Sequence, residues 1–418
     1  MIYLDTSATT SMYPEILYII KQYSVDDYYN PSALYTKALN VAKDIKVAKR
    51  KILDILHGNG NIIFTASGTE SDNMAMFGSK KFKNCKVLVS SVEHSAIYAC
   101  AKKLEASGIQ VEFVDCDAYG IVDINDFKAK MSSNVALVSI MHACNETGGV
   151  NDIEQLVKIA KSVSPKVVFH SDGVQAVGKM PINLSKLGVD LYTFSAHKFH
   201  GMKGVGGLFV KKGVNINPII LGGGQENGLR SATENVSGII STAVALEKTY
   251  KLLDIEKNKK IIQFIADNLA TFIPDLIVNT NFECSLSNIL SFALKNTRGE
   301  VLVHMLEDKG IIIGTGSACS SSKAHSRIPT ALGIPREYFD GMIRISIDNC
   351  TTFEQAETFV KEFKSCYEYL SSVIFNKWYW DLLDVRRKNG KSYYYKIWRN
   401  IFEGKKQKVF WKFAWEKY

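Results

Sequence analysis

The segment Leu191-Tyr192-Thr193-Phe194-Ser195-Ala196-His197-Lys198 carries most of the fold prediction, because a short apolar run passes directly into polar, reactive side chains. An upstream segment, Lys166-Val167-Val168-Phe169-His170-Ser171-Asp172, is built in the same way. Short runs of β-branched and aromatic residues that end in polar residues are typical of buried strands. We therefore expect Asp172 and Lys198 to stand at the ends of two strands.

Runs of this kind recur from Asn61 to Val210, and helix-length segments separate most of them. They are Ile62-Ile63-Phe64, Lys86 to Val89, Val111 to Val114, Val135 to Ile140, Lys166 to Phe169, Leu191 to Phe194 and Gly207 to Val210. This alternation predicts an α/β fold, in which helices flank a mostly parallel seven-stranded sheet. In such a sheet, ligands bind at the carboxyl ends of the strands.

A smaller α/β unit is expected after the sheet. A long helical stretch around Ile239 to Ala266 leads into strand patterns and then a helix, which Thr352 and Gln355 open as a capping box. The strand patterns are Asn288 to Ala293, Ile311 to Ile313 and Met342 to Ile347. We predict a large domain over residues 14–255, a small domain formed by 1–13 and 256–375, and a basic aromatic extension over 376–418.

The composition is that of a globular chain and excludes several classes of protein. Of the 418 residues, 46% are hydrophobic and 22% charged, which excludes a disordered, collagen-like or coiled-coil chain. No run approaches the length of a membrane helix, and the N-terminus lacks the pattern of a signal peptide. The eight cysteines have no C-x-x-C spacing, so we expect free thiols, no structural zinc site and a cytoplasmic protein.

The net charge of +9 is concentrated at the C-terminus. Residues 376–418 hold 12 Lys and Arg against 4 Asp and Glu, together with all five tryptophans, so the rest of the chain is nearly neutral. Three functions of this tail fit its composition: docking onto a scaffold or other partner protein, contact with RNA or another acidic partner, and adhesion to an anionic membrane surface. Packing of the tail against its own body or a dimer mate is the alternative.

Three features of the predicted sheet together indicate pyridoxal phosphate. Thr65 to Asn73 is a small-residue turn that leads from a strand into a helix, where free N–H groups suit a phosphate. Asp172 is a carboxylate at a buried strand end that needs a cationic or protonated partner, although helix capping is the alternative. Lys198 follows the next strand, where burial lowers an amine pKa and favours Schiff-base chemistry. Pyridoxal phosphate requires these three groups: one that binds its phosphate, a carboxylate beside its pyridine nitrogen, and an amine that reacts with its aldehyde.

A fourth feature is the segment from Gly314 to Ser322, in which Gly and Ser surround Cys319. Cysteine is normally buried, yet this one has no apolar neighbours in the sequence. We expect a nucleophilic thiol on a flexible loop that enters a pocket and carries its cargo away. An incidental surface thiol is the alternative.

These residues resemble the pyridoxal-phosphate-dependent cysteine desulfurases of the nitrogen-fixation and iron–sulfur-cluster type, within the fold-type I, class V aminotransferase group. The resemblance extends from about Tyr3 to about residue 375. It runs through Tyr3 to Thr10, Asn30-Pro31-Ser32, Thr69 to Asn73, Glu93-His94, Asn145-Glu146, Asp172 with Gln175, His197-Lys198, Gly222 to Thr233 and Ser317-Ala318-Cys319. It implies a fold-type I architecture with a seven-stranded large domain and a smaller C-terminal domain.

Roles implied by the resemblance fall on matching positions. Lys198 corresponds to the Schiff-base lysine, Asp172 to the partner of the pyridine nitrogen, and Gln175 to a donor to the ring phenolate. His94 corresponds to the imidazole that stacks on the ring and moves protons. The phosphate contacts correspond to Gly68, Thr69, Ser195, His197 and Thr233, and the family supplies the last from the neighbouring protomer, which implies a homodimer. Asn145 and Arg344 correspond to the substrate-binding pair.

The implied reaction converts L-cysteine to L-alanine and leaves the sulfur as a persulfide on Cys319, for iron–sulfur clusters or tRNA thiolation. Selenocysteine lyase or another β-elimination on the same cofactor is the enzymatic alternative, and an inactive homologue that serves as a binding module is the non-enzymatic one. Cys144 stands where the family usually has asparagine, and we expect it to be a buried packing residue.

Overall fold

The computed structural model describes residues 1–79, 84–315 and 327–389, with side chains described up to Val373. The chain divides into two units, Met1–Glu362 and Phe363–Tyr418. Every sheet and cavity discussed below belongs to the first unit. The predicted domain limits at residues 14, 256 and 376 stay predictions.

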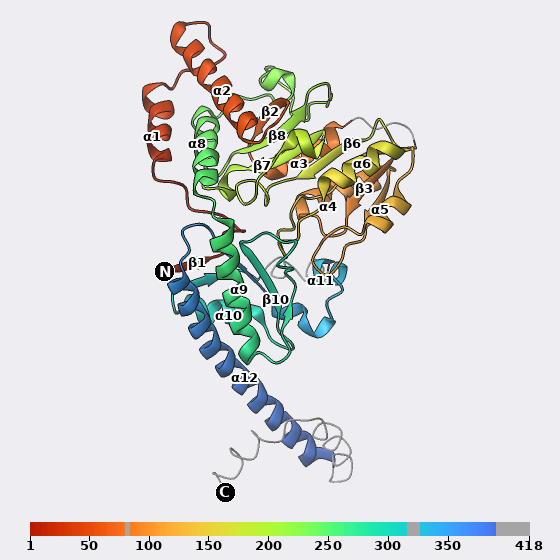
Figure 1. Cartoon of the computed structure of the whole chain (residues 1–418), viewed down its shortest axis with the longest axis vertical. Helices are drawn as coiled ribbons and strands as arrows, with labels where there is room; N and C mark the ends of the chain where they lie inside the picture. Colours follow the sequence, from red (N-terminus) through yellow and green to blue (C-terminus); the bar gives the residue numbers. More distant parts are fainter. Residues whose placement is uncertain (80–83, 316–326, 390–418) are drawn as a thin grey trace. The chain divides into compact units, whose positions relative to one another are not determined.

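A seven-stranded sheet forms the centre of the first unit (Figure 1). Its strands follow the order β2-β8-β7-β6-β5-β3-β4. Its strands are β2 (Gly60–Thr65), β3 (Lys86–Ser90), β4 (Gln110–Val114), β5 (Val135–Ser139), β6 (Val168–Asp172), β7 (Leu191–Ser195) and β8 (Gly206–Lys211). Only β8 runs antiparallel, to both of its neighbours, so the other six strands point the same way. All seven predicted strands and the mostly parallel sheet are confirmed.

Helices cover both faces of this sheet because its strands are apolar on both sides. On one face, Met76 of α3 (Gly68–Gly78) and Ile97 of α4 (Ser95–Ala106) pack with Val87 and Val89. On the other face, Phe169 and Tyr192 belong to the largest core cluster. That cluster also receives side chains from α2 (Thr36–Ile55), α5 (Ile124–Lys130), α6 (Ile153–Val163), α7 (Leu184–Leu187) and α8 (Val236–Leu252). Helices α2 and α8 lie side by side (Figure 1).

Two smaller sheets complete the first unit. The N-terminal strand β1 (Ile2–Leu4) pairs in parallel with β11 (Ile311–Ile313). Strand β10 (Ile289–Ala293) lies between β9 (Ile277–Val278) and β12 (Met342–Ser346) in an antiparallel sheet. The three predicted strands after the large sheet are therefore present. Shorter helices here and near the N-terminus are α1 (Ile16–Lys21), α10 (Gly299–Glu307) and α11 (Arg327–Ala331), with single turns at Gln22–Asp26, Glu226–Gly228 and Arg336–Gly341.

The helical stretch predicted over Ile239 to Ala266 is present, but it consists of two helices. Helix α8 ends at Leu252, and α9 (Ile255–Phe272) begins after an extended residue, Leu253. The side chain of Asp254 accepts a hydrogen bond from the backbone N–H of Lys257 and thus caps α9. An aspartate at this position competes with a continuous helix by bonding the backbone ahead of it.

The capping box predicted at Thr352 and Gln355 is confirmed by reciprocal hydrogen bonds of 3.2 and 3.3 Å. It opens α12 (Phe353–Asn389). Cys319 lies outside the described residues, as do residues 390–418 of the predicted extension. In the described part of the chain, no helix is both long and apolar enough to cross a membrane.

Candidate active site

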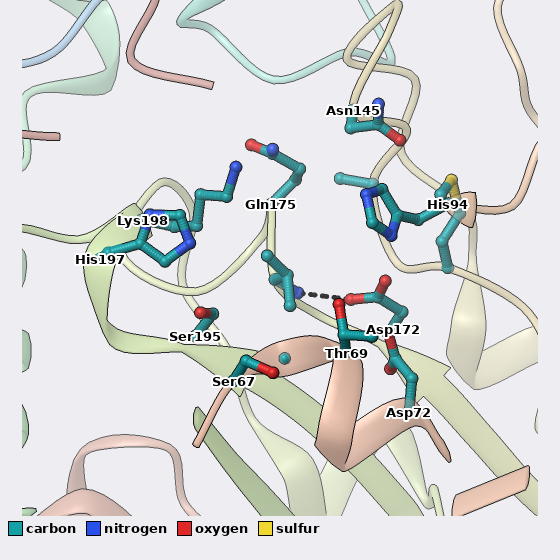
Figure 2. A pocket seen from close by; sticks show the side chains of 14 residues that line it. Ser67, Thr69, Asp72, His94, Asn145, Asp172, Gln175, Ser195, His197 and Lys198 are labelled. Atoms are coloured by element: carbon teal, nitrogen blue, oxygen red, sulfur yellow. Dashed lines mark hydrogen bonds between the residues drawn. The ribbon is translucent and has the colours of Figure 1, made fainter. Parts of the chain in front are cut away.

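A cavity of about 270 Å³ opens where the parallel strands of the large sheet end (Figure 2). The predicted site residues that line it are Gly68, Thr69, His94, Asn145, Asp172, Gln175, Ser195, His197 and Lys198. Arg344 lines a neighbouring cavity, whereas Thr233 is exposed and lines neither of the two. In Figure 2, Lys198 and His197 lie across the cavity from His94 and Asn145.

The loop after β2 brings a helix N-terminus to the cavity. The Ser67 hydroxyl accepts the backbone N–H of Glu70 at 3.1 Å and caps α3, so Gly68 and Thr69 lie in the first helical turn. A side chain at Gly206 of β8 would collide with the Ser67 backbone, since its Cβ would stand 2.3 Å from the carbonyl carbon. Because Gly206 has no side chain, β8 can pack closely against this turn. The N-terminus of α3 at the cavity suits an anion.

Asp172 ends β6 with its carboxylate deeply buried beside the cavity. Oδ1 accepts the backbone N–H of Val174 at 2.9 Å, but the segment after Gly173 forms turns and not a helix, so the helix-capping alternative is wrong. Burial raises the pKa of Asp172, while the nearby His94 and Lys198 act to lower it. Burial and the charge of Asp172 also raise the pKa of Asp72, whose Oδ1 has no hydrogen-bond partner among the described residues. Two buried carboxylates side by side favour a cationic occupant.

Lys198 lies at the end of the short turn Ala196–Lys198 that follows β7. Its Nζ donates to the carbonyl oxygens of Ser7 and Ala8, the latter at 2.9 Å. Burial, followed by the charge of Arg344, lowers the pKa of Lys198 to about 8, although Asp5 and Asp172 act in the opposite direction. An amine with this pKa is uncharged in about a tenth of molecules at pH 7, far more than an ordinary lysine, and can act as a nucleophile or base.

His94, His197 and Gln175 are each held by a specific hydrogen bond. His94 caps α4, because its Nδ1 accepts the backbone N–H of Ala96 at 3.2 Å. Burial lowers the pKa of His197 to about 4, so this imidazole is neutral, and its Nδ1 lies 3.0 Å from the Thr9 hydroxyl. The Gln175 amide donates to the carbonyl oxygen of Ser7 at 3.0 Å.

A second cavity of about 260 Å³ shares His94, Asn145, Gln175 and Lys198 with the first. Arg344 of β12 lines it, with Nη2 3.0 Å from Asp5 Oδ1 and Nη1 donating to the Asn145 carbonyl oxygen at 2.9 Å. Its Nε is buried and has no hydrogen-bond partner among the described residues. A fixed guanidinium with a free donor suits a carboxylate.

The family model "Aminotransferase class-V" matches residues 2–359. The chain belongs to this family. Among its curated relatives, "Cysteine desulfurase IscS" of Dictyoglomus turgidum is 37% identical over 360 residues, which cover 84% of this chain and 91% of the relative. "Cysteine desulfurase IscS" of Methanosarcina thermophila is 35% identical and covers 85% and 89%. The resemblance found in the sequence is thereby confirmed.

Two solved structures superpose on most of the chain. A "NifS-like protein" aligns with a TM-score of 0.80 at 31% identity, covering 88% of this chain and all of the other. "SspA in complex with cysteine" aligns with a TM-score of 0.72 at 26% identity, covering 84% and 100%. The predicted architecture of the large sheet with a smaller second sheet is confirmed.

The cavity fits pyridoxal phosphate, the cofactor implied by the class-V family. A Cβ at Gly68 would approach Val174 Cγ2 to 3.0 Å and Ser195 Cβ to 3.4 Å, so glycine keeps open the space beside the α3 N-terminus. The lining also combines a lysine of lowered pKa, a buried carboxylate and an imidazole. Those groups match the needs of an aldehyde, a pyridine nitrogen and an aromatic ring respectively.

Sequence reasoning assigned no role to four charged residues that line the two cavities. Asp72 lines the first cavity, and Glu93, Glu146 and Arg327 line the second. The three acidic residues lie inside motifs that carry the family resemblance, so their positions were a usable signal, whereas Arg327 lies in none. Cys144 is fully buried beside Met141 and Ile328 in an apolar cluster, and burial raises the pKa of its thiol. It is therefore a packing residue, as expected.

Proposed function

We propose that the chain is a cysteine desulfurase, which converts L-cysteine to L-alanine and leaves the sulfur as a persulfide on Cys319. The observation that carries the proposal is the pair of cavities that share Lys198 and His94, one with the features of a cofactor site and the other containing Arg344. The names of the relatives support the same reaction.

The cofactor site is proposed to hold pyridoxal phosphate through residues of the first cavity. The phosphate would bind at Gly68, Thr69, Ser195 and His197, the pyridine nitrogen at Asp172, and the ring oxygen at Gln175. When bound, the cofactor withdraws electrons from the α-carbon of an amino acid. Asp172 favours this polarity because its buried carboxylate is stabilised by a positive partner.

The substrate carboxylate is proposed to bind Arg344. Asp5 and the Asn145 carbonyl each bind one Nη group and fix the guanidinium, and each Nη keeps a second N–H for a ligand. The Asn145 amide donates to Glu146 Oε1 at 2.6 Å, which fixes the side chain beside the guanidinium. This arrangement orients an α-amino acid with its amino end toward Lys198.

Two groups are proposed to move protons. Lys198 Nζ, with a pKa of about 8, exchanges a proton at the substrate α-carbon. His94 carries its proton on Nε2, since Nδ1 accepts from Ala96 N–H. The Cys319 thiolate attacks the substrate sulfur; the new S–S bond forms as the C–S bond breaks, and the electron pair passes to the substrate carbon, which is then protonated.

Loading of the cofactor is expected to depend on pH through Lys198, because only an uncharged amine attacks an aldehyde. The rate at which cofactor-free protein combines with pyridoxal phosphate should rise about tenfold per pH unit below the amine pKa and level off above it. With the pKa lowered to about 8, the plateau begins near that pH. Stopped-flow absorbance measures the rate. A rise that continues to the ordinary pKa of lysine would contradict the assignment.

The direct test of the proposed function is an assay of the purified chain with L-cysteine, reductant and pyridoxal phosphate. Alanine and sulfide should form in equal amounts. Selenocysteine is the comparison substrate, because a much higher kcat/KM for it would favour the alternative, a selenocysteine lyase. A chain that binds neither cofactor nor cysteine would instead be the binding module considered above.

A homodimer with a shared site is also part of the proposal. Several large apolar side chains are each more than half exposed in the single chain, which supports a protein partner there. They are Leu17, Tyr18, Tyr28, Leu34 and Leu221. Thr233 is exposed as well and is proposed to complete the phosphate site of the partner.

Subunit mixing tests this sharing. Lys198→Ala and Thr233→Glu chains should each be nearly inactive, but a mixed dimer contains one site with both native residues. Unfolded and refolded together in equal amounts, they should recover about a quarter of the wild-type activity. Activity equal to the sum of the two separate variants would contradict a shared site.

The destination of the sulfur is proposed to be iron–sulfur cluster assembly or tRNA thiolation, through a sulfur acceptor or scaffold protein. The basic extension over 376–418 is the proposed contact for an acidic partner or RNA. A cytoplasmic location is proposed too, supported by the free thiols of Cys116, Cys284 and Cys350, because disulfides are rare in that compartment.

A further inference from the structure

The orientation of the His94 ring depends on the backbone that leads into α4. His94 is the N-cap residue of this helix, and its Nδ1 accepts the Ala96 N–H at 3.2 Å. The ring therefore cannot turn about its side-chain bonds without losing this hydrogen bond. Movement of the backbone from Ser91 to His94 would move the ring with it.

Arg327, the first residue of α11, binds this backbone with both ends of its guanidinium. Nη1 donates to the Ser91 carbonyl oxygen at 2.9 Å, and Nη2 donates to the Glu93 carbonyl oxygen at 2.7 Å. The Glu93 carbonyl belongs to the peptide bond that joins Glu93 to His94. The guanidinium carbon also lies 4.3 Å from the centre of the Tyr98 ring, on the first turns of α4.

The opposite side of the same loop is bound by the side chain of Glu93. Its buried Oε1 accepts from the Ser90 hydroxyl at 2.7 Å and from the Met141 N–H at 2.6 Å. The loop is thus held between the sheet on one side and Arg327 on the other. The hydrogen bonds from the charged Arg327 guanidinium are charge-assisted, and such hydrogen bonds are short and directional.

Helix stability alone does not explain an arginine at this place. The N-terminus of a helix carries partial positive charge, so a cation beside α4 is electrostatically unfavourable for the helix. Arg327 lines the second cavity together with His94 and Arg344. Its position at the site, against the helix dipole, favours a role in the site.

We propose that Arg327 is a positioning residue for His94. It acts through the Ser91 and Glu93 carbonyls, which its two Nη groups bind, whereas Arg344 is the arginine proposed to bind the substrate. This inference rests on the proposed function insofar as His94 moves a proton there. Lysine reproduces the fork only in part, because an ammonium lacks the planar pair of nitrogens with which a guanidinium binds two acceptors.

A double-mutant cycle in the holoenzyme tests whether Arg327 acts through His94. Arg327→Met should lower kcat/KM for L-cysteine by about 10- to 100-fold, as expected when a reacting group is displaced. In a His94→Ala background, the same change should cost less than about threefold. Arg327→Lys should recover only part of the loss. The matched control is Arg336→Met, which should leave kcat/KM unchanged. Arg336 is an exposed arginine in the short helical segment Arg336–Gly341 that follows α11.

A second readout needs neither cofactor nor turnover. This readout is nitrogen-15 NMR of the imidazoles in the cofactor-free protein. The chemical shifts of His94 should change in Arg327→Met and stay the same in Arg336→Met. Because this measurement does not use activity, it distinguishes failure of the positioning role from failure of the proposed desulfurase function.

Equal losses of kcat/KM in the native and His94→Ala backgrounds would overturn the proposal, since Arg327 would then contact substrate independently. Unchanged His94 resonances in Arg327→Met would overturn it as well. Thermal unfolding shows whether Arg327→Met is folded. If it is not, the double-mutant cycle and the NMR measurement are repeated with Arg327→Gln, which keeps one NH2 group as a hydrogen-bond donor.

Discussion

Replacement of Lys198 by alanine is expected to lower the kcat for alanine formation by at least about 10³-fold, within the range found for a lost acid–base group. Lys198 Nζ is the amine of lowered pKa in the first cavity, where Asp172 and His94 also lie. Alanine at this position removes both the covalent anchor proposed for the cofactor and the base proposed for the α-carbon proton. Single-turnover quantification of alanine measures the effect.

The control for this experiment is Lys212→Ala, since Lys212 is an exposed lysine beyond the end of β8. It should retain wild-type kcat. Addition of a small primary amine should restore part of the activity to Lys198→Ala and none to a variant that is merely unfolded. Turnover in Lys198→Ala within about tenfold of wild type would refute the assigned role.

Replacement of Cys319 by alanine should separate the two halves of the reaction. The side chains that bind the cofactor and substrate remain, so L-cysteine should still change the visible absorption of the holoenzyme. Sulfide release in the presence of reductant should fall by roughly 10²-fold or more, because the thiolate nucleophile is gone. Trapping with a thiol-specific alkylating reagent, followed by mass spectrometry, measures the persulfide directly.

Cys350→Ala is the matched control for Cys319→Ala, because Cys350 is an exposed thiol outside both cavities. Its persulfide and sulfide yields should equal those of wild type. Normal sulfide release by Cys319→Ala would exclude Cys319 as the acceptor. It would point instead to direct elimination of sulfide, as in the β-elimination alternative.

The sheet could be predicted from the sequence because a short run of neighbouring residues is enough to indicate each strand. A run such as Leu191 to Phe194 is mostly apolar and buried on both faces, and its neighbours on the sheet, β6 and β8, are buried over most of their length. The polar residues that end β6 and β7 then had to meet at one edge, since parallel strands point the same way. Asp172 and Lys198 were found for this reason.

The remainder of the site depends on contacts that no local pattern records. Arg344 and Asp5 are separated by 339 residues, and only the folding of β12 beside the N-terminal segment brings them together. The fork of Arg327 binds the Ser91 carbonyl 236 residues away. A backbone carbonyl has no signature in the sequence, so such a partner cannot be read from residue types. The break between α8 and α9 was missed because the apolar pattern continues across Asp254.

The central claim is that Lys198 is the lysine that binds the cofactor. Reduction of the purified holoenzyme with borohydride, followed by proteolysis and mass spectrometry, measures this directly. A pyridoxyl group should be found on the nitrogen of Lys198 and should be absent from Lys198→Ala. Attachment to Lys179, the other buried lysine beside Gln175, or no attachment at all, would contradict the account.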